Sequence, residues 1–194
     1  MTRNRLKLLL LAVVIGVLIF PGTKSWFFGV GLRWLYLLLL GFSISHFLTP
    51  FAIRLGHRFG ILDQPGGRKR HRVPVPLLGG AVIFLAFAVV VNYNFYYSWE
   101  LKGVALGATL VFLLGFLEDV WGLPTLVRPL GHIGAAVILM VHGVRMSFLP
   151  DVWWGNVIEV IITIIWVVGL TNAYNFIDGM DGLATGSAII NSFF

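Results

Sequence analysis

The chain has 194 residues, of which 58% are hydrophobic and only 11% are charged, and its mean hydropathy is +0.92. A soluble domain usually carries about 25% charged residues, so this composition excludes an ordinary soluble fold and predicts a membrane protein. The net charge of +6 is weak evidence for nucleic-acid binding, because the basic residues flank apolar runs instead of forming a water-exposed basic face. The chain contains no cysteine, which excludes disulfides, thiolate metal sites and thiol nucleophiles.

The first apolar segment, about Leu6–Phe20, has three basic residues at its start, Arg3, Arg5 and Lys7, which precede the apolar run from Leu8 to Phe20. It therefore resembles the start of a signal peptide. The residues after it read PGTK and offer no convincing small-residue cleavage site. We therefore interpret this segment as an uncleaved first membrane helix.

Five further apolar segments follow along the chain, and a seventh begins at Ser187. The five are about Trp34–Ile53, Leu78–Val91, Gly103–Leu117, Pro129–Val144 and Val157–Thr171. Several are shorter than the ~20 residues that a membrane-spanning helix needs, so we expect them to extend into their flanks. The pattern predicts an all-α, polytopic membrane bundle of about six to seven transmembrane helices, forming a single domain over residues 1–194.

The basic residues predict the orientation of these helices. If the N-terminus lies inside and the helices alternate, ten basic residues fall inside and four outside, as the positive-inside rule requires. The same alternation places three polar loops on the cytoplasmic side, at about residues 56–76, 118–128 and 172–186. These loops hold five of the eight acidic residues, so we expect one face of the membrane to carry the chemistry.

The first of these loops contains a dense basic cluster just after a Pro-Gly turn signal. Its members are Arg68, Lys69, Arg70, His71 and Arg72. Cations and fork-shaped donors of this kind suit a phosphate group. The alternative is that the charges only keep the loop on the inside of the membrane.

The second loop opens with two adjacent carboxylates, Glu118 and Asp119, at the end of an apolar segment. Adjacent carboxylates repel each other, and they need a counter-charge at the membrane edge. Mg²⁺ is a natural candidate, because it takes one or two carboxylates and completes its shell with water and substrate phosphate. The alternative is a hydrated helix end.

The third loop, NAYNFIDGMDGL, carries amides and carboxylates at three-residue steps: Asn172, Asn175, Asp178 and Asp181. Gly179 and Gly182 permit a break into a loop in which the backbone can approach a ligand closely. Amides can bind ribose, base or phosphate, and carboxylates can bind metal or accept a proton. The alternative is a plain helix end capped by Gly179.

Together the three loops favour phosphoryl transfer, which depends on positioning and on neutralising charge. A site at the membrane edge suits one lipid substrate and one soluble, nucleotide-like substrate. We expect His46, His132 and His142 to be satisfied within the bundle and not to bind metal.

Three stretches resemble, in order and spacing, the cytoplasmic motifs of the polyprenyl-phosphate N-acetylhexosamine-1-phosphate transferases. They read DQPGGRKRHRVPVPLLGG, GFLEDVWGL and NAYNFIDGMDGLATG, and the resemblance covers about Trp34 to Phe194. The third motif is highly specific. The stretch RKRHRVPVPLLGG is more similar to the branch that uses UDP-N-acetylglucosamine than to the branch that makes the first lipid intermediate of peptidoglycan.

The resemblance implies a multi-pass enzyme of the bacterial plasma (inner) membrane with its motif loops in the cytoplasm. Such enzymes transfer a sugar-1-phosphate from a UDP-sugar to undecaprenyl phosphate and release UMP, which initiates the synthesis of cell-envelope polysaccharides. They use Mg²⁺, with Mn²⁺ as the alternative. The implied partners are a UDP-sugar and a polyprenyl phosphate but no nucleic acid, and a homodimer is left open.

The resemblance also assigns roles by motif position. Glu118 and Asp119 match the acidic pair near the metal and the lipid phosphate. Asp178 and Asp181 match acids important for activity and nucleotide binding. The remaining candidates for substrate binding are Arg68, Lys69, Arg70, His71, Asn172, Asn175, Gly179 and Gly182.

Two departures from the family pattern stand out. The first acid of the pair is usually aspartate, and Glu118 reaches one methylene further, which can shift the metal geometry. The chain also lacks the family's later aspartate and histidine motifs, so we expect an N-terminal portion of such an enzyme that is inactive alone. The alternatives are a non-catalytic membrane remnant or partner subunit and, less favoured, a transporter.

Overall fold

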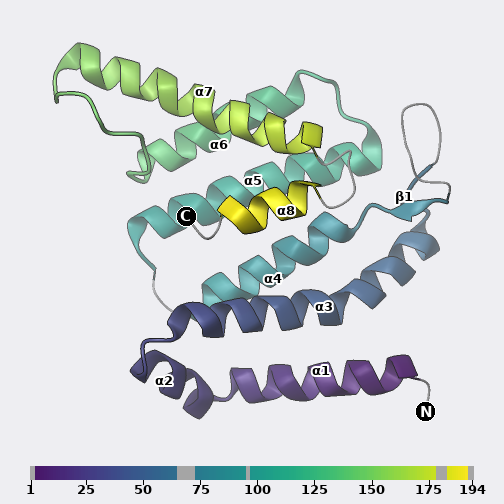
Figure 1. Ribbon diagram of the computed structural model, residues 1–194. Helices are drawn as coiled ribbons and strands as arrows, with labels where there is room; N and C mark the ends of the chain where they lie inside the picture. Colours follow the sequence, from purple (N-terminus) through teal and green to yellow (C-terminus); the bar gives the residue numbers. More distant parts are fainter. Residues whose placement is uncertain (1–2, 65–72, 95–96, 178–182, 192–194) are drawn as a thin grey trace. The chain divides into compact units, whose positions relative to one another are not determined.

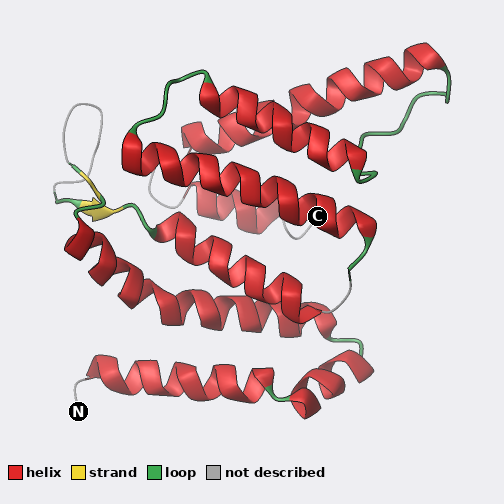
Figure 2. Ribbon diagram, turned by 180° about the vertical axis from the view of Figure 1, so that it is seen from behind, coloured by secondary structure: helices red, strands yellow, loops and turns green. Residues whose placement is uncertain are grey.

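The computed structural model describes residues 3–64, 73–94, 97–177 and 183–191, and this part consists of helices, one small two-stranded sheet and the loops that connect them (Figures 1 and 2). The helices are α1 (Arg3–Ile19), α2 (Pro21–Gly29), α3 (Arg33–Phe59), α4 (Gly79–Asn94), α5 (Trp99–Trp121), α6 (Val127–Val141), α7 (Trp153–Ile177) and α8 (Leu183–Asn191). The sheet pairs β1 (Leu62–Asp63) with β2 (Val75–Pro76) in antiparallel fashion. The predicted all-α membrane fold is therefore confirmed.

Three of the described helices, α3, α5 and α7, are long and apolar enough to cross a membrane. The consecutive helices α1 and α2 form a fourth span if the pair counts as one, and α4 and α6 are shorter apolar helices. Large apolar side chains project from these helices, for example Val13, Ile83 and Ile165, which are 63%, 67% and 65% exposed. Such exposure is expected when the surrounding solvent is lipid.

The sequence did not predict the bend of 65° between α1 and α2. It occurs at Pro21, the first residue of α2, and Phe20 before it is extended with φ −61° and ψ 129°. A proline lacks the N–H that would continue the preceding helix and drives the residue before it out of helical geometry. One apolar run therefore becomes two helices.

The chain divides into two compact units, one with α1 to α4 and the sheet, the other with α5 to α8. The predicted single domain stays a prediction. In the first unit α3 contacts α1, α2 and α4, so α3 is central (Figure 1). Its core centres on Tyr36 and Leu40, which are fully buried, and the Tyr36 hydroxyl donates a hydrogen bond of 2.8 Å to the carbonyl oxygen of Leu18 on α1.

The two strands of the small sheet belong to the connection between α3 and α4, and β2 contacts α3. Gly60, with φ 68°, ends α3 in the left-handed conformation that glycine adopts without strain. Gly56 lies so close to the sheet that a Cβ added there would be 2.7 Å from the Cβ of Pro76. Glycine at this position therefore permits the close approach of helix and sheet.

In the second unit α6 contacts both α5 and α7, and α8 contacts α7. Small buried residues allow α5 and α6 to pack closely: Gly103 and Gly107 on α5, and Ala135 and Ala136 on α6. A Cβ added at Gly103 would lie 2.4 Å from the Cβ of His142. Close backbone approach between small residues is a common way for membrane helices to associate.

The connection between α6 and α7 is bound to the side of α7 by an acidic side chain. The Glu159 carboxylate, on a residue only 2% exposed, accepts hydrogen bonds from the backbone N–H groups of Phe148 at 2.7 Å and Leu149 at 2.8 Å. Thr163, one turn further along α7, accepts the N–H of Met146 at 3.1 Å. These side chains satisfy backbone donors that have no partner in a helix or sheet.

Candidate functional site

The acidic pair lies in the last turns of α5, as the sequence predicts. Glu118 is half-buried and Asp119 is exposed, and the helix ends at Trp121. Gly122 follows with φ 66°, and its N–H donates a hydrogen bond of 2.8 Å to the carbonyl oxygen of Glu118. Successive residues on a helix point about 100° apart, so the two carboxylates leave the helix in different directions.

An arginine that was counted above only among the ten basic residues on the inside connects the acidic pair to a second predicted site residue. Arg128, at the start of α6, donates through Nε to Oε2 of Glu118 at 2.5 Å. It also donates through Nη1 to Oδ1 of Asn175 at 3.0 Å. These three residues, which we call the Arg128 bridge, bring the end of α5, the start of α6 and the last turns of α7 together.

The helix dipoles explain why these two charges need each other. Arg128 lies at the positive N-terminal end of α6, and Glu118 lies at the negative C-terminal end of α5. Each placement is unfavourable by about 0.3–1 kcal/mol for a charge of that sign. The ion pair offsets both costs, and its side chains are 31% and 28% exposed, so solvent screens it only in part.

The predicted Mg²⁺ site at the acidic pair stays a prediction. Glu118 and Asp119 supply the oxygen donors that this ion prefers, at a helix C-terminus whose free carbonyl groups also attract a cation. Among the described residues no group of three His, Asp or Glu side chains could hold a metal. The bond to Arg128 occupies Oε2 of Glu118 and no other atom of that carboxylate.

The helix α7 extends beyond the apolar segment that ends at about Thr171 and continues to Ile177, in line with the expected extension into the flanks. Thr171 donates to the carbonyl oxygen of Val167 at 2.7 Å, and Asn172 donates to that of Val168 at 2.9 Å. Because these polar groups are satisfied on their own helix, they do not force the chain into a loop. Asn172 is thus not part of the Arg128 bridge, and its role in substrate binding stays a prediction.

The other predicted site residues lie outside the described part of the chain. They are Arg68, Lys69, Arg70, His71, Asp178, Gly179, Asp181 and Gly182. Their roles therefore stay predictions.

Arg128 is the member of the Arg128 bridge that sequence reasoning did not single out. A signal was present, since Arg128 is the only lysine or arginine between Lys102 and Arg145, and it is the next charged residue after the acidic pair, nine residues beyond Asp119. What the pattern could not supply was its second partner, because Asn175 is 47 residues away along the chain.

The expectation that the histidines are satisfied within the bundle is right for His142 and wrong for His132. His142 is hydrogen-bonded, with Nδ1 2.8 Å from the carbonyl oxygen of Ile138. His132 is 5% exposed, yet its Nδ1 has no hydrogen-bond partner among the described residues. It lies on α6, one turn after Arg128, on the buried face that also carries Ala135 and Ala136.

The comparison with known sequences covers this same region. Residues 101–194, which contain the acidic pair, Arg128 and Asn175, match the glycosyl transferase family 4. The chain belongs to glycosyl transferase family 4. No solved structure matches this family 4 chain.

Relatives of named function match more of the chain than this region. A probable undecaprenyl-phosphate N-acetylglucosaminyl 1-phosphate transferase of Bacillus subtilis is 34% identical over 149 residues, 74% of the chain and 42% of the relative. A decaprenyl-phosphate N-acetylglucosaminephosphotransferase of Mycolicibacterium smegmatis is 32% identical over 181 residues, 84% of the chain and 45% of the relative. An undecaprenyl-phosphate alpha-N-acetylglucosaminyl 1-phosphate transferase of Thermotoga maritima is 29% identical over 149 residues, 77% of the chain and 47% of the relative. The chain thus spans less than half the length of the curated relatives it matches.

Proposed function

We propose that the protein to which this chain contributes transfers N-acetylglucosamine-1-phosphate from its UDP derivative to undecaprenyl phosphate, releasing UMP. The observation that carries this proposal is the Arg128 bridge, which joins the acidic pair to Asn175 at one end of three helices. The named activities of the relatives support the choice of substrates. The product starts a cell-envelope polysaccharide at the inner membrane, with the site on the cytoplasmic side.

In this reaction an oxygen of the lipid phosphate attacks the phosphorus that carries the sugar. The bond between that phosphorus and the bridging oxygen of UMP breaks, and UMP leaves with the bonding electron pair. A phosphate monoester is largely ionised near neutral pH, since its second pKa is about 6. The acceptor therefore needs little help from a base, and the site must above all hold two anionic substrates in line.

Four described residues have separate roles in holding the substrates. Asp119 and Glu118 would hold Mg²⁺, which when bound offsets the negative charge of the phosphates. Arg128 fixes the Glu118 side chain and adds a positive charge at the same helix end. Asn175 keeps the last turns of α7 next to Arg128 and the acidic pair.

The test is an assay of the protein at its full natural length, purified in a membrane mimetic, with UDP-N-acetylglucosamine and undecaprenyl phosphate. Asp119→Asn keeps the size of the side chain and removes its charge, and we expect transfer to fall by at least about 100-fold, as for a misplaced catalytic group. Asp151→Asn is the matched control, because Asp151 is an exposed acid on the connection between α6 and α7 and bonds only Asn156, at 2.9 Å. Its activity should stay unchanged.

The identity of the released nucleotide separates two reactions. Release of UMP means that the sugar leaves with its phosphate, whereas release of UDP would mean transfer of the sugar alone. Unchanged transfer in Asp119→Asn, with normal insertion in the membrane, would remove Asp119 from the site. Release of UDP by the unaltered protein would contradict the proposed reaction itself.

A further inference from the structure

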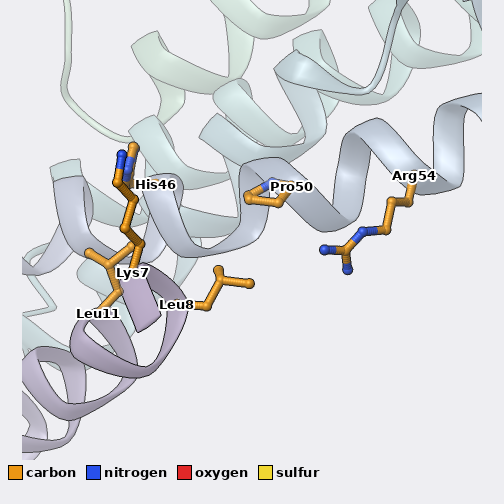
Figure 3. A pocket seen from close by; sticks show the side chains of 6 residues that line it. All are labelled: Lys7, Leu8, Leu11, His46, Pro50 and Arg54. Carbon is orange, nitrogen blue, oxygen red and sulfur yellow. The ribbon is translucent and has the colours of Figure 1, made fainter. Parts of the chain in front are cut away.

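A second set of basic side chains gathers in the first unit, between α1 and α3. Lys7, His46 and Arg54 line a pocket of about 190 Å³ together with Leu8, Leu11 and Pro50 (Figure 3). The three nitrogen-bearing side chains are exposed, and the other three residues are half-buried. The pocket thus has a cationic rim and an apolar floor.

The bend of α3 explains why a pocket exists at this place. Pro50 lies inside α3 and has no N–H to donate to the carbonyl of His46, so the helical hydrogen-bond ladder is interrupted beside the pocket. Beyond this point α3 curves away from α1, as both views show (Figures 1 and 2). The ends that diverge are the N-terminal end of α1, with Lys7, and the C-terminal end of α3, with Arg54.

The cations of this pocket have no acidic partner within their own helices. Residues 1–62 contain seven lysines and arginines but neither aspartate nor glutamate, and the first acid along the chain is Asp63. Neither Lys7 nor Arg54 forms an ion pair with any residue that the structure describes, and the Arg54 guanidinium lies 5.2 Å from the centre of the Phe51 ring. A contact with a ring leaves the guanidinium N–H donors without an anionic acceptor.

We propose that this pocket binds the phosphate of an anionic membrane phospholipid, with Lys7 and Arg54 as its charged contacts. A volume of about 190 Å³ is several times the ~30 Å³ of one water, so a phosphate group fits. The apolar floor of Leu8, Leu11 and Pro50 favours a lipid over free phosphate, because an acyl chain can cover it. Basic residues at the end of a membrane helix are a typical recognition site for anionic lipids.

The experiment is native mass spectrometry of the full-length natural protein, titrated with palmitoyl-oleoyl phosphatidylglycerol or with the matching phosphatidylcholine. We expect the unaltered protein to bind phosphatidylglycerol more tightly. The double variant Lys7→Gln, Arg54→Gln should weaken that binding by about 30-fold, since each cation near the membrane surface contributes about fivefold. The matched control is Arg5→Gln, Arg58→Gln, which removes the same charge from exposed sites on the same two helices outside the pocket.

Several results would overturn the proposal. An equal loss in the control variant would mean that lipid binds the general positive charge of these helices. Equal binding of phosphatidylcholine would remove the role of the anionic headgroup, and displacement by inorganic phosphate would mean that no lipid is needed. Displacement by equimolar undecaprenyl phosphate would assign the pocket to the acceptor substrate.

A second variant keeps the test decisive if the charge variant inserts poorly in the membrane. Leu11→Trp keeps every charge and fills the floor of the pocket, so it should weaken phosphatidylglycerol binding while the protein remains cationic. Binding unchanged in this variant would contradict the pocket.

Discussion

Replacement of Glu159 by alanine should release the connection between α6 and α7 from the side of α7. The carboxylate accepts two backbone N–H groups, at 2.7 and 2.8 Å, and the residue is 2% exposed. A hydrogen bond to a charged acceptor contributes about 1.5–3 kcal/mol, so the two bonds together account for about 3–6 kcal/mol. Because Phe148 is exposed and its N–H can be rehydrated, we expect a loss of about 2–4 kcal/mol in the free energy of unfolding.

The shape-conserving variant Glu159→Gln should separate charge from geometry. It retains an acceptor oxygen and loses only the charge, so the expected loss is about half as large, near 1–2 kcal/mol. Unfolding in a mild detergent would measure both losses, and amide hydrogen exchange would show faster exchange at Phe148 and Leu149. Asp151→Ala, which removes an exposed acid from the same connection, is the control and should change stability by less than about 0.5 kcal/mol.

The reasoning fails if Glu159→Ala unfolds like the unaltered protein and the two amides keep their slow exchange. That result would mean that the N–H groups find other acceptors without cost. A loss as large in Asp151→Ala would instead trace the effect to the net charge of the connection.

Three further predictions concern single side chains. Tyr36→Phe should destabilise the first unit by about 1 kcal/mol in thermal unfolding, because it removes the hydrogen bond to the Leu18 carbonyl, and an unchanged transition would show that this bond contributes nothing. Gly103→Ala should lower the free energy of unfolding by about 1–3 kcal/mol, because its new methyl group overlaps His142 at the end of α6. Gly115→Ala on the same helix meets nothing within 4 Å and should be neutral, and equal effects of the two variants would contradict the close packing. Arg128→Lys should lower UMP release by about tenfold, because one ammonium cannot reproduce the fixed fork that contacts two partners, and full activity in this variant would show that charge alone suffices.

The local sequence pattern was enough to predict where the helices lie but not where they begin and end. The apolar runs mark the positions of the helices because each must bury its backbone polar groups within itself in lipid. The helices α3, α5 and α7 extend beyond the predicted limits at one end or both, since polar residues can remain helical by bonding their own backbone, as Thr171 and Asn172 do. The break at Pro21 was readable from the chemistry of proline, although the apolar run before it concealed the second helix.

The sequence by itself determined the class of the protein and the chemical character of its loops. A low content of charge requires a membrane fold, and adjacent carboxylates such as Glu118 and Asp119 attract a cation wherever they lie. The tertiary structure alone decided which side chains meet, because such contacts depend on how whole helices pack and not on any local period. It paired Arg128 with Glu118 and Asn175, bound Glu159 to a distant stretch of backbone, and placed Lys7 and Arg54 around one pocket.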